Sequence, residues 1–279
     1  MKKLFDQVSE RCSKIVTESY STSFTLATKM LDFSIRQDIY NIYGFVRFAD
    51  EIVDSFHEFN KKELLDLFEK DLKKSINDKI SLNPILNSFQ KTLHKYDIDY
   101  ELVDSFLKSM KLDLDKNKYL SKKEFDQYVY GSADVVGLMC LKVFVKGNQQ
   151  QYEELKPYAM SLGSAFQKVN FLRDLKADHY GLNRSYFPNL NIEKFDESSK
   201  QRILNEIDQD FSHALKGIFK LPSSAKFGVY TAYKYYLKLL NKLRKTHPLK
   251  IKSSRIRVPN YQKVNVLARS YVRYRLNIL

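Results

Sequence analysis

The sequence predicts an all-α protein, and three observations support this. Apolar residues recur at spacings of three and four through most of the chain. No segment long enough to build a sheet alternates with the period of a strand. Helix breakers are rare, with 8 glycines and 6 prolines in 279 residues. Apolar residues make up 43% of the chain, which is enough for a substantial core. Because no linker or low-complexity tract divides the chain, we expect one helical domain over residues 1–279.

The expected helices of the first half follow this apolar rhythm. An amphipathic helix over 4–19 is followed by a polar break at 20–24 and a short helix over 23–31. Asp32 or Ser34 could cap the next helix, which carries the segment 43–54. Shorter outer helices are then expected over 61–76, over 84–96 with Pro84 in the first turn, and over 99–112.

The second half continues in the same way. Ser121 and Glu124 form a capping box, and the helix that it opens is expected to reach residue 145. A helix over 150–180 ends at a loop over 181–188. Two further helices, 194–219 and 224–246, and a basic connection at 255–259 lead to a terminal helix.

The segment 43–54 places polar groups on one helical face. Tyr43, Arg47, Asp50 and Asp54 are separated by steps of 4, 3 and 4. The apolar residues follow the same rhythm one position earlier and are expected to form a core-facing stripe of Ile35, Ile39, Ile42, Val46, Ala49, Val53 and Phe56. Two carboxylates and an arginine would therefore lie at the edge of a hydrophobic interior.

A second segment has the same design. Gln167, Asn170, Asp174 and Asp178 are separated by steps of 3, 4 and 4, with Arg173 beside the acids. Like charges four residues apart cost a few tenths of a kcal/mol, and an isolated pair usually lies on a solvated face. Two such pairs, each with an arginine and an apolar stripe, instead indicate a shared site.

The chemistry of these residues favours Mg²⁺, because this ion takes oxygen ligands and is typically held by a few carboxylates together with substrate phosphates. Two facing helices could hold a small Mg²⁺ cluster that binds a diphosphate and stabilises it as a leaving group. Arg47 and Arg173 could then bond to the phosphate oxygens.

Composition limits the other functions. The net charge of +14 is compatible with nucleic acid, an anionic membrane or a phosphorylated substrate. The lysines are spread along the chain and the acidic pairs would repel nucleic acid, so we do not expect a nucleic-acid-binding protein. The acid at Asp6 comes too early for a secretory signal peptide. The apolar run 135–145 is too short to span a bilayer. Cys12 and Cys140 are expected to be free thiols. We expect a cytoplasmic protein that touches the inner face of the membrane at most transiently.

The segment 113–124 resembles a calcium-binding EF-hand loop, with Asp113 at the first position and Glu124 at the twelfth. The sixth position requires glycine for a sharp turn and is Lys118 here. No second loop pairs with it, so we do not expect calcium binding.

The motifs together resemble the phytoene/squalene synthase family, whose members join two prenyl diphosphates head to head, and the form of 43–54 is most similar to bacterial phytoene synthases. The matching segments occur in family order and cover nearly the whole chain; they are Tyr20-Ser-Thr-Ser-Phe24, Tyr43-x-x-x-Arg47, Arg47-Phe-Ala-Asp-Glu-Ile-Val-Asp54, Gly137-Leu-Met139, Gln167-x-x-Asn170-x-x-Arg173-Asp174-x-x-x-Asp178 and Arg184-x-Tyr186-Phe-Pro188.

The resemblance implies an isoprenoid-synthase fold, a helical bundle around a central apolar cavity. It also implies site residues. Those implied to bind Mg²⁺ and diphosphate are Asp50, Asp54, Asp174 and Asp178, with Asn170 in the metal shell. Those implied to contact phosphate or order that shell are Ser21, Ser23, Arg47, Gln167, Asn170 and Arg173, and Tyr43, Tyr236 and Arg257 complete the diphosphate end. Some relatives have a His and a Lys beside the first serine, where this chain has Tyr20 and Thr22.

The reaction implied is the condensation of two geranylgeranyl diphosphates to 15-cis-phytoene through a cyclopropyl diphosphate intermediate, as in carotenoid biosynthesis. Mg²⁺ is the expected ion, with Mn²⁺ as an alternative, and NADPH is not expected. The alternative within the family is a farnesyl diphosphate-using dehydrosqualene or squalene synthase. The sequence does not indicate an oligomeric state.

Overall fold

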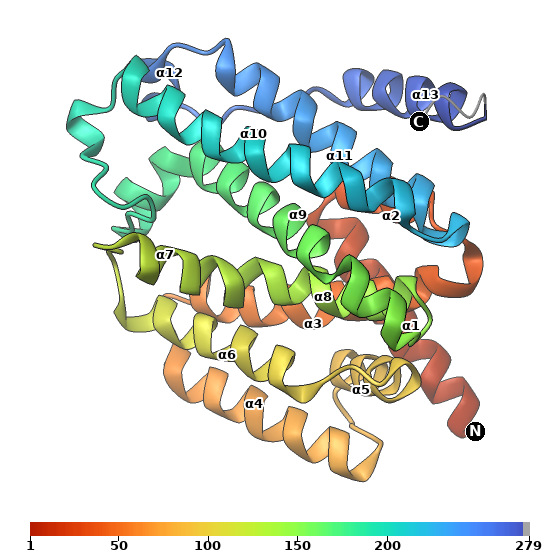
Figure 1. Cartoon of the computed structure of the whole chain (residues 1–279). Helices are drawn as coiled ribbons and strands as arrows, with labels where there is room; N and C mark the ends of the chain where they lie inside the picture. The colour runs from red at the N-terminus through yellow and green to blue at the C-terminus, as the bar shows by residue number, and fades with distance from the viewer. Residues whose placement is uncertain (276–279) are drawn as a thin grey trace.

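The computed structural model describes residues 1–275, and within this range it is a bundle of α-helices (Figure 1). The first half of the chain forms α1 (Lys2–Tyr20), α2 (Thr22–Thr28), α3 (Phe33–Asp54), α4 (Lys61–Asp78), α5 (Pro84–Tyr96) and α6 (Tyr100–Asp115). The second half forms α7 (Lys122–Val129), a π-helical turn η1 (Tyr130–Asp134), α8 (Val135–Phe144), α9 (Gln149–Lys176), a second π-helical turn η2 (Ala177–Gly181), a 3₁₀ turn η3 (Ile192–Lys194), α10 (Glu197–Lys220), α11 (Ser223–Arg244), α12 (Pro248–Ser253) and α13 (Asn260–Arg275).

The all-α prediction is confirmed. Residues 1–275 contain no strand, and their one β-bridge joins Lys118 to Ser185. Most predicted helices are present with ends within a few residues of those expected. The sequence analysis did not identify α12, η3 or the two π-helical turns. No helix among these residues is both long and apolar enough to cross a bilayer.

The capping residues act largely as their types predict. The Asp32 side chain accepts a hydrogen bond from the Ser34 amide at 2.9 Å and begins α3. Ser121 accepts from the Glu124 amide at 3.2 Å. The Glu124 carboxylate in turn accepts from the Leu120 amide at 2.9 Å. This contact accounts for Glu124 as a capping residue.

The apolar stripe of α3 is buried as predicted over most of its length. Ile35, Ile39, Ile42, Ala49 and Val53 are each at most 2% exposed, and they belong to the core that joins α3 to the neighbouring helices. Two further residues of the stripe behave differently. Val46 is only partly buried because it faces a cavity. The prediction for Phe56 was wrong: α3 ends at Asp54, so Phe56 leaves the helical register and is 37% exposed.

The helix predicted over 121–145 contains a π-helical turn at η1, where one extra residue per turn shifts the register. The shift occurs where η1 packs closely against α6. A Cβ at Gly131 would lie 2.0 Å from the Ser109 hydroxyl, so only glycine fits there. The hydrophobic period does not reveal such a turn, because apolar residues continue on both sides of it.

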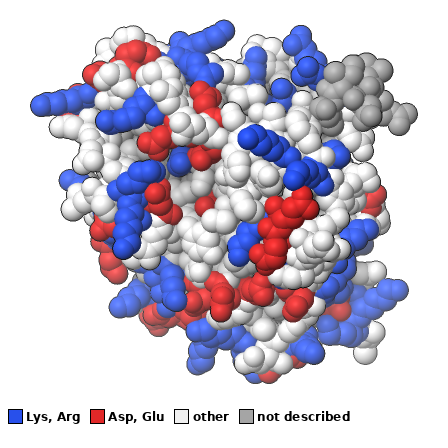
Figure 2. Space-filling model, in the orientation of Figure 1, with Lys and Arg blue, Asp and Glu red and all other residues white. Residues whose placement is uncertain are grey.

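The two central helices α3 and α9 lie in the middle of the bundle, with α10 and α11 on one side and α4, α5 and α6 on the other (Figure 1). Figure 2 shows lysine and arginine side chains spread over one face and mixed with acidic groups, without a continuous basic stripe on its described part.

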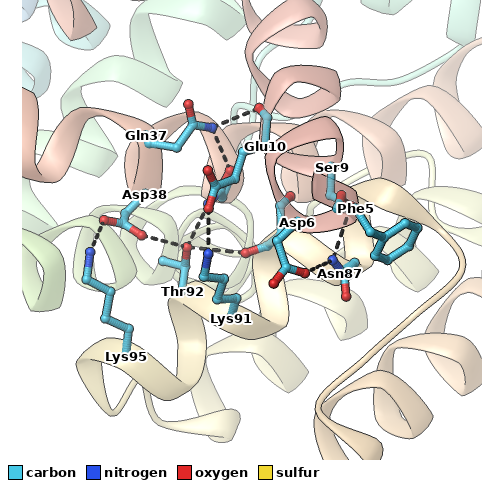
Figure 3. A network of polar contacts seen from close by, with 12 residues as sticks. Phe5, Asp6, Ser9, Glu10, Gln37, Asp38, Asn87, Lys91, Thr92 and Lys95 are labelled. Carbon is cyan, nitrogen blue, oxygen red and sulfur yellow. Dashed lines mark hydrogen bonds and ion pairs between the residues drawn. The ribbon is translucent and has the colours of Figure 1, made fainter. Parts of the chain in front are cut away.

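A polar seam joins α1 to α3 and α5 (Figure 3). The side of α1 that faces the bundle carries Ser9, Ser13 and Thr17, all fully buried. The Ser13 and Ser88 hydroxyls are 2.7 Å apart. A Cβ at Gly44 would lie 2.9 Å from the Ser13 hydroxyl, so the glycine lets α1 and α3 approach closely.

Asp38 is the charged centre of this seam. Its carboxylate accepts hydrogen bonds from the Thr92 hydroxyl at 3.0 Å, the Lys95 ammonium at 2.8 Å and the Tyr96 hydroxyl at 2.9 Å. Asp38 is only 7% exposed and is the acceptor for the Tyr96 hydroxyl. The Thr92 hydroxyl can also donate to the Ser88 carbonyl at 3.3 Å, and the Lys95 side chain is half-exposed.

We therefore predict that Asp38→Ala lowers the free energy of unfolding by about 2–3 kcal/mol, because it removes the ion pair with Lys95 and leaves the buried Tyr96 hydroxyl without its acceptor. Asp38→Asn keeps one acceptor oxygen and is expected to cost about half as much. Urea unfolding followed by circular dichroism measures both. Asp71→Ala, at an exposed position of α4, is the control and should stay within about 0.5 kcal/mol of wild type. Equal stability of Asp38→Ala and the control would contradict this account.

Candidate active site

A cavity of about 550 Å³ lies between α3 and α9 and is walled mainly by apolar side chains. Its volume is in the usual range of ligand pockets. Both acidic motifs lie at the carboxyl ends of their helices, so α3 and α9 deliver them to the same mouth. From Ile39 to Asp54, α3 follows the cavity for about 22 Å, given a rise of about 1.5 Å per residue. The cavity therefore has a charged mouth and a long apolar interior.

Ten of the residues predicted for the site line this cavity: Tyr43, Arg47, Asp50, Asp54, Gln167, Asn170, Arg173, Asp174, Asp178 and Tyr236. The remaining three are Ser21, Ser23 and Arg257, which lie outside the lining. Ser21 caps α2, its hydroxyl accepting from the Phe24 amide at 3.2 Å. Arg257 is exposed, and its main-chain carbonyl accepts from the Lys242 ammonium at 2.6 Å.

Each acidic motif has one acid that is paired with arginine. The Asp54 carboxylate lies 2.7 Å from Nη1 of Arg184. The Asp174 carboxylate pairs with Arg173 beside it and with Arg255, whose Nε lies 2.7 Å from Oδ1. Arg255 thus occupies the position at the mouth that the sequence analysis gave to Arg257.

The other acid of each motif has no such partner. Asp50 and Asp178 make no side-chain hydrogen bond or ion pair with any described residue. Burial raises the pKa of Asp50 to about 8, and the nearby charge of Asp54 adds to the effect. Burial also raises the pKa of Asp178 to about 7, with contributions from Asp174 and Asp54. Arg184 pairs with Asp54 through its guanidinium and donates its amide to the Asp178 carbonyl, so the two motifs lie together at the mouth.

A fifth carboxylate, Asp113, was missed by the sequence analysis, which considered it only as part of an EF-hand-like loop. It lines the cavity, accepts a hydrogen bond from the Tyr128 hydroxyl at 2.7 Å, and leaves its other oxygen without a partner in the described structure. Burial raises its pKa to about 7. The spacing of Phe106, Met110 and Asp113 on α6 could have indicated it, because these steps of 4 and 3 continue the buried face.

Arg184 connects these carboxylates. Its guanidinium bonds to Asp54 at one nitrogen and donates to the main-chain carbonyl of Asp113 at 2.8 Å with the other. Its own amide donates to the carbonyl of Asp178 at 2.7 Å. Arg184 therefore joins α3, α6 and η2 at the mouth, although the sequence analysis placed it only in a loop motif.

A row of amides and hydroxyls continues the polar wall. The Tyr236 hydroxyl donates to Asn170 at 3.3 Å, the Asn170 amide lies 3.5 Å from Gln167, and the Gln167 amide donates to Ser132 at 3.3 Å. The ring of Tyr236 stacks on Phe166, with centroids 3.9 Å apart. This row ties α11, α9 and η1 together beside the acids.

The donor set fits a divalent cation. No three Asp, Glu, His or Cys side chains within residues 1–275 are grouped closely enough to hold an ion unaided. Mg²⁺ does not require this, because it usually keeps several waters and binds through one or two carboxylates plus substrate phosphates. The two acids without partners, Asp50 and Asp178, are hard oxygen donors, and burial raises their pKa values despite the arginines nearby. A bound cation would favour their ionised form.

A comparison with known proteins identifies the family. The family model described as squalene/phytoene synthase matches residues 17–262, most of the chain. The chain belongs to this family. Membership identifies a prenyltransferase and implies prenyl diphosphates as its substrates.

Individual relatives agree with this assignment. The chain is 26% identical to the phytoene synthase of Arthrospira platensis, covering 96% of this chain and 93% of the relative. It is 28% identical to the 15-cis-phytoene synthase of Synechocystis sp., covering 81% of this chain and 74% of the relative. A crystal structure of a dehydrosqualene synthase superposes with a TM-score of 0.83 over 97% of this chain and 98% of that chain, at 20% identity, which confirms the isoprenoid-synthase fold.

The raised pKa of Asp50 predicts a pH-dependent stability. An acid whose pKa is higher in the folded protein than in the unfolded chain stabilises the fold at low pH, and this stabilisation is lost as the pH rises through the folded value. Without divalent cations, we expect the free energy of unfolding to fall between about pH 6 and pH 8, where ordinary carboxylates no longer titrate.

Asp50→Asn removes this titration. We expect the variant to be about 1–3 kcal/mol more stable than wild type at about pH 8, with a flatter pH profile. Urea unfolding in EDTA at a series of pH values measures the difference. Glu58→Gln makes the same chemical change at an exposed position and should follow the wild-type curve. If the free energy of unfolding depends on pH in the same way in Asp50→Asn and in wild type, the pKa of Asp50 is not raised in the folded protein.

Proposed function

We propose that the enzyme joins two geranylgeranyl diphosphates head to head, with Mg²⁺, to form 15-cis-phytoene. The observation that carries the proposal is the pair of D-x-x-x-D motifs at the mouth of one long apolar cavity, each with arginine beside it. The twenty-carbon substrate is supported by the relatives named as phytoene synthases.

The acids would hold the metal. Asp50, Asp54, Asp174 and Asp178 are the candidate ligands, and Mg²⁺ bound there would supply the charge that stabilises diphosphate as a leaving group. The acids can only bind metal when they are ionised, so the raised pKa values of Asp50 and Asp178 imply that binding releases protons near neutral pH.

The arginines would bind the diphosphate. Arg173 and Arg255 already converge on Asp174, and Arg47 pairs with Glu51 at the other side of the mouth. Phosphate oxygens can replace these carboxylates as partners, with charge-assisted hydrogen bonds of the same kind. A side pocket of about 330 Å³, lined by Arg173, Lys176 and Arg255, adjoins Asp174 and offers room for phosphate groups of a second substrate.

The interior would protect the allylic cation that forms when diphosphate leaves. The stacked rings of Phe166 and Tyr236 and those of Phe24 and Tyr43 line the cavity just inside the polar mouth. Aromatic faces attract cations, and apolar walls exclude the water that would quench one. The chain's own residues therefore supply binding, orientation and exclusion of water.

A product assay tests the proposal. Purified enzyme with geranylgeranyl diphosphate and Mg²⁺, without NADPH, should yield phytoene, identified by mass and absorption spectra. Asp50→Asn and Asp174→Asn should each lower kcat by about a thousandfold or more, because each removes a metal ligand. EDTA should abolish turnover of the wild type. Glu58→Gln, beyond the end of α3, is the control and should retain full activity. No product from any prenyl diphosphate, with folding verified, would refute the proposal.

Farnesyl diphosphate is the second candidate substrate, favoured by the similarity in fold to a dehydrosqualene synthase. The two candidates differ in how far the hydrocarbon reaches into the cavity. Ala159 lines the cavity in the first half of α9, about 22 Å along the helix from Asp174. A larger side chain there should obstruct the distal part of a long hydrocarbon.

We predict that Ala159→Phe lowers kcat/KM for geranylgeranyl diphosphate at least about tenfold relative to farnesyl diphosphate, because each CH₂ kept out of the apolar interior forfeits about 0.8 kcal/mol. Competition between the two substrates, with products separated by chain length, measures the ratio. Ala159→Val is the smaller matched change and should shift the ratio less. An unchanged ratio in Ala159→Phe would mean that the substrate does not extend past Ala159.

A further inference from the structure

Helix α1 presents apolar side chains to solvent. Leu4, Val8 and Ile15 are 63%, 46% and 61% exposed, and their spacing of four and seven residues puts them on one side of the helix. The opposite side, in the polar seam, is made of small hydroxyl residues. A surface helix of a globular protein normally has the reverse arrangement. The outer apolar row therefore contributes nothing to holding α1 on the bundle.

Cationic side chains border this row. Lys3, Arg11 and Lys14 are exposed, lie along one flank of this row, and form no ion pair with a described residue. The acids of the helix are each paired with a lysine; the pairs are Asp6 with Lys2, Glu10 with Lys91 and Glu18 with Lys29. The outer face of α1 is thus both apolar and positively charged.

A second group of exposed apolar side chains lies near the first turns of α1, in the loop 79–83. Asn87 donates to Asp6 of α1 at 3.1 Å, and its side-chain oxygen accepts from the Ser81 amide at 3.2 Å, so this loop lies beside the first turns of α1. Ile80 and Leu82 in this loop are 42% and 92% exposed.

We propose that this surface, the α1 face of Leu4, Val8, Ile15, Lys3, Arg11 and Lys14, docks the protein on an anionic lipid bilayer. A helix with an apolar row flanked by cations lies in the plane of a membrane interface, where the row enters the headgroup boundary and the cations meet lipid phosphates. The charge of the face selects an anionic surface over a neutral one. The polar seam leaves the apolar row free for lipid, so docking does not require α1 to unfold.

Vesicle flotation of the full chain tests this surface. On vesicles with about one third phosphatidylglycerol, binding should be about 100-fold stronger than on phosphatidylcholine alone. Each of the three cations is expected to strengthen binding roughly fivefold, and the three factors multiply. The triple variant Leu4→Glu, Val8→Glu, Ile15→Glu should lower binding to the anionic vesicles at least about tenfold. The matched control is Leu67→Glu with Leu249→Glu, at positions 52% and 65% exposed on α4 and α12, and should bind as wild type does.

A second variant separates charge from apolar insertion. Lys3→Glu, Arg11→Glu, Lys14→Glu should abolish the preference for anionic over neutral vesicles, and circular dichroism should show every variant folded. Equal binding of wild type to both vesicles, or unchanged binding of the two triple variants, would overturn the proposal. A dimer in lipid-free solution that the Leu4, Val8 and Ile15 variant dissociates would assign the face to a second copy of the chain and would also overturn it. None of these measurements depends on the identity of the prenyl substrate.

Discussion

The arrangement of this molecule depends on one electrostatic constraint, which is that several carboxylates lie together where an apolar cavity opens. Like charges in such surroundings repel strongly, since little water screens them. Arginine side chains offset part of this repulsion. Arg184, for example, bonds to residues of α3, α6 and η2 at once. The offset is incomplete: burial raises the pKa values of Asp50 and Asp178, and the charges of neighbouring acids add to the effect. A cation bound at the mouth would relieve both costs.

The rigid elements place this charge accurately. Both acidic motifs are on long helices, and their packing in the centre of the bundle fixes the carboxylates relative to one another. The two π-helical turns adjoin the same region: η1 contributes Ser132 and Ala133 to the cavity wall, and η2 contains Asp178. A π-helical turn changes the direction of the side chains that follow it, and such turns are frequent at functional sites.

The sequence was sufficient for the helices and for the two acidic motifs at the mouth of the cavity, because periodicity and capping are local properties. It was insufficient wherever an outcome depended on packing between distant segments. Asp113 and Arg255 reach the mouth because α6 and the segment before α13 pack there. The helical spacing on α6 indicates that Asp113 is buried, but it does not indicate that Asp113 lies at this mouth. The two π-helical turns were missed for the same reason. Helix α1 shows the limit most clearly: its amphipathic period was correctly recognised, but a period does not say which face turns inward.

The cavity gives the hydrocarbon of the substrate a second role. The apolar side chains around it, such as Ile39, Val46 and Leu155, are in contact with the packed interior on one side only. Dispersion contacts and removal of water from their other side become available when a chain of CH₂ and CH₃ groups enters. A prenyl tail in this cavity would therefore complete the hydrophobic core, and we expect the substrate-bound enzyme to be more tightly packed than the free one. Release of product would empty this space again, so the interior would be filled and emptied once in each catalytic cycle.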